Sequence, residues 1–469
     1  MQLYQVVNQN DIEKLHATTL RIMDEIGVVI GSAKARNILA KGGAKVDGQT
    51  VHISQAMIER ALKTVPPSFS LWGRGGQEVP INTGDTFYAG PDGAPFVHDI
   101  DRGRRDGNVE DLINLTKLCH MMNTIDVISY CVCEPVDVDV SVRHMELLYN
   151  KIKYSSKPQM GPTFSYEAAK QGLEMIAIVF GGVEAIKEKP ALLGIPSSLS
   201  PLSFDERSAG AIMAFAEYGQ PQLINSLCMA GATAPTTLPG AIAIQNAEIL
   251  AGITLAQLVN PGTPVVYSAS GSSVDMRLGS LAVGAPESAL FSLINGQLAK
   301  YYNIPCRISG AISDSKCVDA QAGYESMMTL LMAQMAGGNY ILHGGGIMET
   351  YNCVSYEKLM MDDDIVGMVR RIGRGVEVND ETLAFDLIKE VGPLGAYINQ
   401  SHTFKTFRKE FYLPVVSDRN NYDQWVKKGS LTAEQRANAR WKKLLAEYEE
   451  PTLPAEVDRG LRKYIESQK

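Results

Sequence analysis

The sequence carries few charges, no long uncharged apolar run and no basic excess. Charged residues make up 20% of its 469 residues and hydrophobic residues 45%, a balance that argues against a disordered chain and suffices for a large core. The net charge of −8 argues against a nucleic-acid-binding protein, whose surface is expected to be basic. The most apolar segment, 241–259, is interrupted by Gln245, Asn246 and Glu248, so we expect no membrane partner.

Signals for export and for the common nucleotide-binding loops are also missing. The first residues do not show a basic stretch followed by an apolar one, and the seven cysteines are scattered. We therefore expect a cytoplasmic protein with reduced thiols. No Gly-x-Gly-x-x-Gly follows a β-rich run and no Gly-Lys-Ser/Thr is present, which argues against a dinucleotide fold and a P-loop.

The middle of the chain alternates short apolar runs with helical stretches, at intervals of roughly 30–40 residues, the length of a βα unit. The expected strands are 125–133, 158–163, 191–197, 222–228, 264–269, 305–310 and 340–342. The expected helices are 143–149, 166–179, 205–218, 241–259, 287–301 and 320–335. Seven units are visible and an eighth would close a barrel, so we expect a decorated TIM (β/α)8 barrel. An open doubly wound sheet is the alternative.

The segments on either side of this repeat have a different character. Residues 1–115 combine helical patterns with short β pieces and predict an N-terminal α+β extension. Residues 116–355 hold the βα repeat, and residues 356–469 predict a helical region packed on the barrel. The expected helices of that last region are 356–371, 383–391, 404–411 and 432–448.

In such a barrel the reactive groups belong at the carboxyl ends of the strands. Glycine is abundant, with 42 residues, and glycines lie at several of these ends. The sharpest local feature is His343 followed by Gly344, Gly345 and Gly346, which predicts an imidazole beside backbone amides able to meet an anion. A glycine-rich turn with a core histidine is the structural alternative.

Two thiols and a carboxylate at another strand end leave a second chemistry open. Cys131, Cys133 and Glu134 have ligand types that suit zinc, although no fourth ligand lies nearby in the sequence. Aromatic residues near the expected strand ends are suited to a quaternary ammonium group, which binds aromatic faces. They are Tyr88, Tyr130, Phe164, Tyr267, Tyr324, Tyr351 and Tyr356. The acids available beside them are Asp92, Glu134, Asp314, Glu325 and Glu349.

Several longer stretches together are more specific. They are HATTLRIMDEIGV at 16–28, AGPDGAPFVHD at 89–99, SDSKCVDAQAGYES at 313–326, HGGGIMET at 343–350 and SYEKLMMDDDIVGM at 355–368. In these stretches the chain resembles the trimethylamine/betaine:corrinoid methyltransferase family over most of its length. The resemblance implies a decorated TIM barrel that takes a methyl group from an amine and passes it to cob(I)alamin carried by a separate corrinoid protein. The carrier motif Asp-x-His-x-x-Gly is absent here, which agrees with a separate partner.

The resemblance also narrows the substrate. The trimethylamine enzymes of the family carry pyrrolysine, which we would expect near Ser309–Ala311, and this chain consists of ordinary amino acids only. It is therefore similar to the subgroup lacking pyrrolysine, which implies a quaternary amine: glycine betaine first, then proline betaine, carnitine or butyrobetaine. Because such a substrate releases a neutral tertiary amine, we expect no catalytic acid or base and no metal.

From their positions we expect the following pocket residues. Tyr88, Tyr267 and Tyr324 would face the ammonium group. His343, with the amides of Gly344 and Gly345, would hold a carboxylate. Glu349 is also expected to bind the substrate. Positioning is expected from His343, Glu325 and Asp314, and contact with the corrinoid from Gly310 and Ser313.

Two other functions stay open at this point. One is a zinc-dependent thiol or alcohol methyltransferase that uses Cys131, Cys133 and Glu134. The other is a betaine-binding protein without catalysis. For the methyltransferase we expect a homo-oligomer.

Overall fold

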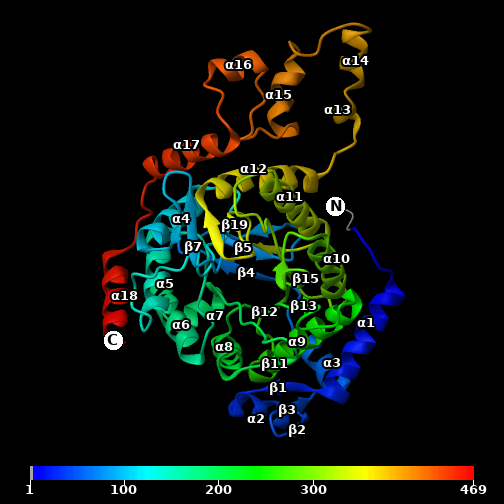
Figure 1. Ribbon diagram of the computed structural model, residues 1–469, viewed down its shortest axis with the longest axis vertical. Helices are drawn as coiled ribbons and strands as arrows, with labels where there is room; N and C mark the ends of the chain where they lie inside the picture. Colours follow the sequence, from blue (N-terminus) through cyan, green and yellow to red (C-terminus); the bar gives the residue numbers. More distant parts are fainter. Residues whose placement is uncertain (1–3, 469) are drawn as a thin grey trace.

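The N-terminal residues fold into a small α+β layer against the main body (Figure 1). The structure, a computed structural model, describes residues 4–468. The layer contains α1 (Gln9–Arg21), a π-helical turn η1 (Ile22–Ile26), α2 (Ala33–Lys41) and α3 (Gln55–Thr64), with strands β1 (Val28–Ile30), β2 (Lys45–Asp47) and β3 (Thr50–His52). A hairpin around Asp47 and Gly48 joins β2 and β3. Both α1 and α3 pack on a long central helix, α9 (Leu238–Val259).

A ring of parallel strand pairs forms the main body. Four paired strands, β12 (Gln222–Ser226), β14 (Val265–Ala269), β17 (Cys306–Ser309) and β18 (Tyr340–Leu342), lead to β6 (Phe87–Tyr88). Parallel bridges continue from Ala89 to Val127 and from Ile128 to Gln159 on β9 (Gln159–Met160). β9 then pairs with β10 (Leu192–Leu193), and Gly194 bridges back to Gln222. The pairing order thus returns to β12.

The strand that sequence reasoning did not assign is β6. It lies within the expected extension 1–115, yet it pairs with β18 and its next residue bridges to Val127. The next hairpin, β7 (Phe96–Asp99) and β8 (Gly103–Asp106), pairs through β7 with β20 (Cys353–Ser355), which in turn pairs with β19 (Ile347–Met348). The expected boundary at 115/116 therefore falls inside the paired body.

One end of the ring is filled by a hairpin. β4 (Phe69–Trp72) and β5 (Glu78–Ile81) place Leu71, Val79 and Ile81 in one buried cluster with Leu223 and Val266. The Trp72 amide donates to the Pro190 carbonyl, just before β10. This β4–β5 hairpin, here called the plug, therefore lies at the amino ends of the strands. The carboxyl ends remain available for a functional site.

Helices follow the strands as expected. The bounds are α4 (Val109–Met121), α5 (Arg143–Tyr154), α6 (Tyr166–Phe180), α7 (Val183–Glu188), α8 (Glu206–Glu217), α10 (Pro286–Tyr301), α11 (Ala320–Met335) and α12 (Tyr356–Arg374). Side chains of Ser165, Asp205, Asp319 and Ser355 cap the first turns of four of them by accepting backbone N–H bonds. Short strands β11 (Ser203–Phe204), β13 (Met229–Ala230), β15 (Ser272–Asp275) and β16 (Ser280–Ala282) decorate the connections.

The helix α9 is long and apolar enough to cross a membrane by composition alone. Of its most apolar window, 83% is buried within the protein. It packs against α1, α3, α8 and two ring strands. These contacts give α9 the position of a core helix.

The C-terminal helices divide into two groups. The helices α17 (Ala433–Ala446) and α18 (Ala455–Ser467) pack on α4 and α12 and on α5 and α6, respectively. The short helices between them and α12 are α13 (Asp380–Leu383), α14 (Phe385–Val391), α15 (Ser401–Glu410) and α16 (Tyr422–Lys427). These project away from the ring, in orange at the top of Figure 1, and contain no buried residue.

Candidate active site

The carboxyl ends of three ring strands hold a connected polar cluster. Side chains alternate across a strand, so Arg307 and Ser309 on β17 share one face. The Arg307 guanidinium donates from Nη1 to Asn225 Oδ1 of β12 at 3.3 Å and to Ser270 Oγ. Ser268 Oγ and Ser270 Oγ donate to the same Asn225 oxygen, at 2.9 and 3.0 Å. The neutral oxygens of Asn225 and Ser270 thus orient the charged guanidinium of Arg307.

The charge on Arg307 is buried without a carboxylate to pair with. Its side chain is 1% exposed, and its Nε–H has no hydrogen-bond partner. Within residues 4–468 no carboxylate lies within ion-pair distance of it; Asp92 acts on it only through the longer-range field. Burial lowers the pKa of the guanidinium, which still stays charged at neutral pH. A buried, incompletely paired cation is costly and marks an anion-binding position.

An aromatic pair lies beside this guanidinium. The rings of His343, directly after β18, and Tyr351 are 5.0 Å apart. The Tyr351 hydroxyl donates to Ser309 Oγ at 3.3 Å. Burial, reinforced by the positive charge of Arg307, lowers the pKa of His343 well below 6.5, so its imidazole is neutral. The His343 Nδ1 has no partner.

The loop that carries Tyr351 is strained. Glu349, Thr350 and Tyr351 have φ values of +50°, +56° and +71°, in the left-handed region that non-glycine residues rarely adopt. Asp314 holds this loop, because it accepts the Thr350 hydroxyl at 2.7 Å and the amides of Val283 and Gly284. Strain that the surroundings maintain is characteristic of functional sites.

A second aromatic pair lies at the ends of the neighbouring strands. The rings of Tyr130 and Phe164 are 5.7 Å apart, and the Lys151 ammonium lies 4.9 Å from the Tyr130 ring centre. Lys151 donates to two backbone carbonyls, one of them that of Met160. Desolvation lowers the Lys151 pKa and raises that of Asp92, which accepts the Cys131 amide at 2.7 Å.

Two of the expected ammonium-binding residues point away from these pairs. The Tyr88 hydroxyl donates to Gln334 on α11, and the Arg370 guanidinium of α12 lies over its ring. The Tyr267 hydroxyl donates to Asn246 on α9 and to Asn295 on α10. Both side chains are fully buried between the strands and the helices around them. The third, Tyr324, is exposed near the start of α11.

The expected acids have structural partners. Glu325 accepts the Ser313 hydroxyl and the Asp314 amide, at 2.7 and 2.8 Å. Glu349 is ion-paired with Arg104 at 2.9 Å. Asp314, as described above, holds the 349–351 loop. These side chains therefore support the rim of the site through other residues.

The glycine amides expected to cradle an anion are largely used elsewhere. The Gly344 amide donates to the Ala89 carbonyl at 2.7 Å and the Gly346 amide to Asp362 at 2.8 Å. A Cβ on Gly345 would contact Asp362 at 2.8 Å, and one on Gly310 would lie 2.7 Å from the His343 carbonyl. These glycines allow close packing of the strand ends against the helices.

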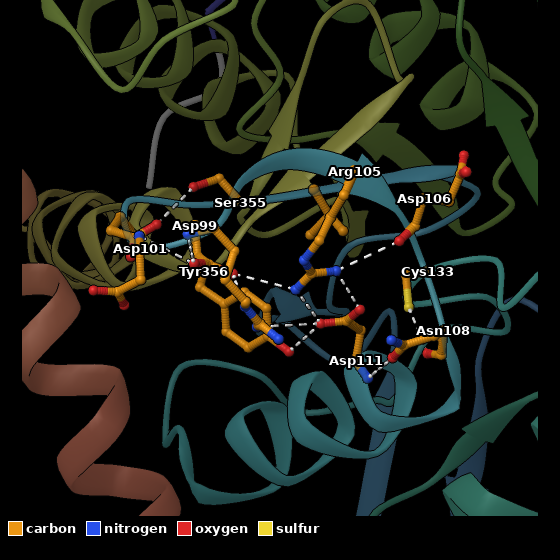
Figure 2. A network of polar contacts seen from close by, with 12 residues as sticks. Asp99, Asp101, Arg105, Asp106, Asn108, Asp111, Cys133, Ser355 and Tyr356 are labelled. Carbon is orange, nitrogen blue, oxygen red and sulfur yellow. Dashed lines mark hydrogen bonds and ion pairs between the residues drawn. The ribbon is translucent and has the colours of Figure 1, made fainter.

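The two cysteines of the zinc alternative have different neighbours. Cys133 lies against the Asn108 carbonyl beside a buried network in which Arg105 pairs with Asp99 and Asp111, and Tyr356 donates to Asp111 (Figure 2). Burial raises the pKa of both the Cys131 and the Cys133 thiols. Within residues 4–468 no three His, Cys, Asp or Glu side chains form a metal-binding group.

Two adjoining open cavities lie at the opposite end of the ring. One has a volume of about 290 Å³ and is lined by residues that include Lys300 and Asn339, and the other has a volume of about 400 Å³ and is lined by residues that include Arg370 and Arg374; Asp85 and Gln334 line both. At the carboxyl ends there is a small recess, lined by residues that include Ser270, Gly271, Ser309 and Tyr351. We assign the site to the recess, because in barrels of this type chemistry occurs at the carboxyl ends.

Comparisons with known proteins show the family to which this chain belongs. The model of the trimethylamine methyltransferase (MTTB) family matches residues 1–469. The chain belongs to this family. It is 43% identical to the glycine betaine methyltransferase of Desulfitobacterium hafniense (strain Y51), over 98% of this chain and 96% of that protein. It is 32% identical to the proline betaine:corrinoid methyltransferase of Eubacterium limosum, over 88% and 87% of the two chains.

A solved structure supports the fold alone. The monomethylamine methyltransferase (MtmB) of Methanosarcina barkeri superimposes with a TM-score of 0.51 at 14% identity, over 100% of this chain and 96% of that one. This family member therefore has the mixed α/β architecture of a methylamine methyltransferase.

Sequence reasoning missed Arg307 and Asn225 and treated Tyr351 as one candidate among seven. A signal for Arg307 was present, because it is the one charged residue of a short strand, Cys306–Ser309, within the expected apolar run 305–310. A charged residue at a buried strand position requires a partner or a ligand.

Proposed function

We propose that this protein transfers a methyl group from a carboxylated quaternary amine, with glycine betaine as the first choice, to the cob(I)alamin of a separate corrinoid protein. The observation that carries the proposal is the buried Arg307 guanidinium without a carboxylate partner, at the carboxyl ends of the strands. A betaine supplies that carboxylate on the same molecule as its methylated nitrogen. The similarity to two proteins named for betaines supports the same substrate class.

The roles of the side chains follow from their chemistry. Arg307 binds the carboxylate through its free N–H groups, and Asn225 and Ser270 keep it in position. The aromatic faces of Tyr351 and His343 bind the ammonium, which has no proton to donate. A neutral His343 adds no positive charge that would repel the ammonium. Tyr88 and Tyr267 take no part in binding, because their hydroxyls donate to Gln334, Asn246 and Asn295 on the surrounding helices.

The methyl acceptor is a second substrate that arrives on a partner. Its cobalt(I) supplies the nucleophile for the methyl carbon. The leaving group is a neutral tertiary amine, so this chain need only orient the nitrogen–methyl bond and exclude water. The loops after the ring strands expose apolar residues on which a partner can dock: Val136, Val140, Phe164, Leu199, Met276 and Leu278.

The fold that we infer is a decorated (β/α)8 barrel in a cytoplasmic protein. The closed order of parallel pairs supports eight strands, with β6 as the first and the 127–128 segment as the second. We place the start of the barrel before Phe87, with the N-terminal extension ahead of it. The helical residues after α12 form the C-terminal region.

The test is a spectral assay of methylcobalamin formation. The full chain is incubated with cob(I)alamin and glycine betaine, proline betaine, carnitine, butyrobetaine or tetramethylammonium, which lacks a carboxylate. We expect methylcobalamin from at least one betaine and none from tetramethylammonium. If no quaternary amine yields methylcobalamin, the proposal is wrong. Betaine binding in calorimetry without methyl transfer would indicate a binding protein, and bound zinc with thiol methylation would indicate the zinc enzyme.

A further inference from the structure

The segment 376–411, here called the arm, projects from the body and is tied to it near its end, where Arg371 of α12 is ion-paired with Glu410 at 3.4 Å and Arg374 donates to the Lys409 carbonyl. It comprises α13, α14 and α15 with their connections, and none of these helices contains a buried residue. Figure 1 shows it standing clear of the ring, above α12. The chain returns to the body just beyond the arm, where Asp364 of α12 accepts the Tyr412 hydroxyl at 2.8 Å and the Ser417 amide at 2.7 Å. The arm is therefore held at its base only.

The arm exposes an unusual amount of apolar surface. Phe385 is 70% exposed, Ile398 80%, and Leu394 is fully exposed. The other exposed apolar residues of the arm are Val376, Val378, Leu383, Ile388, Tyr397, Phe404 and Phe411. Together these side chains present on the order of 1,000 Å², against about 800 Å² per partner in a standard interface and about 300–600 Å² for the largest patch of a typical monomer. A surface of this size is expected to be covered.

The charges of the arm are arranged in two halves of opposite sign. Residues 376–390 contain Glu377, Asp380, Glu381, Asp386 and Glu390 against Lys389, a net charge of −4. Residues 401–411 contain Lys405, Arg408 and Lys409 against Glu410, a net charge of +2. A two-fold symmetric interface brings each half of one copy against the other half of the second copy, so both contacts join opposite charges.

The position of the arm separates it from the proposed corrinoid partner. The arm begins directly after Arg374, which lines a cavity together with Asp85 and Thr86, just before the start of β6. This is the amino end of the strands, whereas a methyl acceptor must reach the carboxyl ends. The acidic half also makes an anionic lipid surface a poor match.

We propose that the arm is the interface with a second copy of this chain, in a two-fold arrangement that places α13 and α14 of one copy on α15 of the other. The pairing covers the apolar residues and matches both charged halves. This inference does not depend on the reaction that the protein catalyses.

The experiment is sedimentation velocity on the full chain at several micromolar concentrations. We expect twice the mass of one chain for the wild type. Two charge-reversal variants are compared with it: E377K/E381K/D386K, which changes the acidic half from −4 to +2, and K405E/R408E, which changes the basic half from +2 to −2. Each alone is expected to sediment as a monomer, because both contacts then join like charges, and an equimolar mixture is expected to recover the dimer mass.

Controls keep the outcomes distinct. I26E changes an exposed apolar residue of the N-terminal layer and is expected to stay dimeric. Thermal unfolding midpoints within a few degrees of the wild type show that the variants are folded. A monomeric wild type overturns the proposal. So do charge-reversal variants that remain dimeric, or monomeric variants that fail to pair when mixed.

Discussion

In the proposed function, Arg307 is the residue on which substrate selection depends most. Its guanidinium is buried among neutral partners, Asn225 and Ser270, so the anionic charge that completes it has to come from the ligand. A trimethylamine molecule has no such group. The same feature therefore selects among the methylated amines that the relatives of this chain are named for.

Replacing Arg307 by Gln keeps a polar side chain and removes the charge. We expect kcat/KM for glycine betaine to fall about 100-fold or more, since two charge-assisted hydrogen bonds contribute about 3 kcal/mol or more. The measurement is steady-state methylation of cob(I)alamin. R207Q, which changes an arginine that is 72% exposed, is the matched control and should retain the wild-type value. If R307Q leaves the KM for glycine betaine unchanged, Arg307 does not bind the substrate carboxylate.

His343 gives a prediction for the pH dependence of stability. Its folded pKa is lowered by burial, so the unfolded chain takes up a proton near pH 6.5 that the folded chain does not. The contribution is fully present above pH 6.5 and is lost as the pH falls, by about 1.4 kcal/mol per unit. We expect unfolding free energies at pH 7 and pH 5 to differ less in H343Q than in the wild type. Equal slopes would mean that His343 titrates normally in the folded protein.

The sequence predicted the position of some of these side chains and not of others. His343 was predicted at the site because a histidine followed by three glycines is distinctive, and it lies beside Arg307. Tyr267 also lies near the end of an expected strand, yet its side chain points outward to Asn246 and Asn295. Whether a strand residue faces the ring or the helices depends on register, and a strand that is buried on both faces shows no alternation from which to read it.

At the scale of elements, the hold of Asp314 on the 349–351 loop is the feature to test. D314A removes three hydrogen bonds to Thr350, Val283 and Gly284, whereas T350V removes one. We expect T350V to cost about 1 kcal/mol of unfolding free energy and D314A about 3 kcal/mol, with a larger loss of kcat for D314A because Tyr351 shifts. Denaturant unfolding and methylation rates measure the two effects. Equal stability of D314A and the wild type would show that the loop holds its conformation unaided.

Elements with strong local signals were predicted closely. The expected helix 320–335 coincides with α11, and Asp319 caps it, as such a side chain should. The expected strand 340–342 coincides with β18. The strand β6 was missed because it is two residues long and lies among glycine- and proline-rich β pieces. Its place is set by pairing with β18, a contact across some 250 residues that no local pattern reports.

At the scale of the whole molecule, the two ends of the ring have separate tasks. The carboxyl ends hold the buried cation and the aromatic pairs, and the amino ends hold the β4–β5 plug and, nearby, the base of the arm. A dimer formed through the arms would leave both sites open to a corrinoid partner. The helical C-terminal region was predicted from the sequence, but its exposed arm was not, because helical periodicity does not say which molecule covers an apolar face.

The central claim is that this chain moves one methyl group from a betaine to a corrinoid. The most direct measurement is the yield of both products from glycine betaine and cob(I)alamin with the purified full chain. We expect dimethylglycine and methylcobalamin in a one-to-one ratio, in amounts that depend on the protein. Dimethylglycine without methylcobalamin, or neither product from any betaine, would contradict the claim.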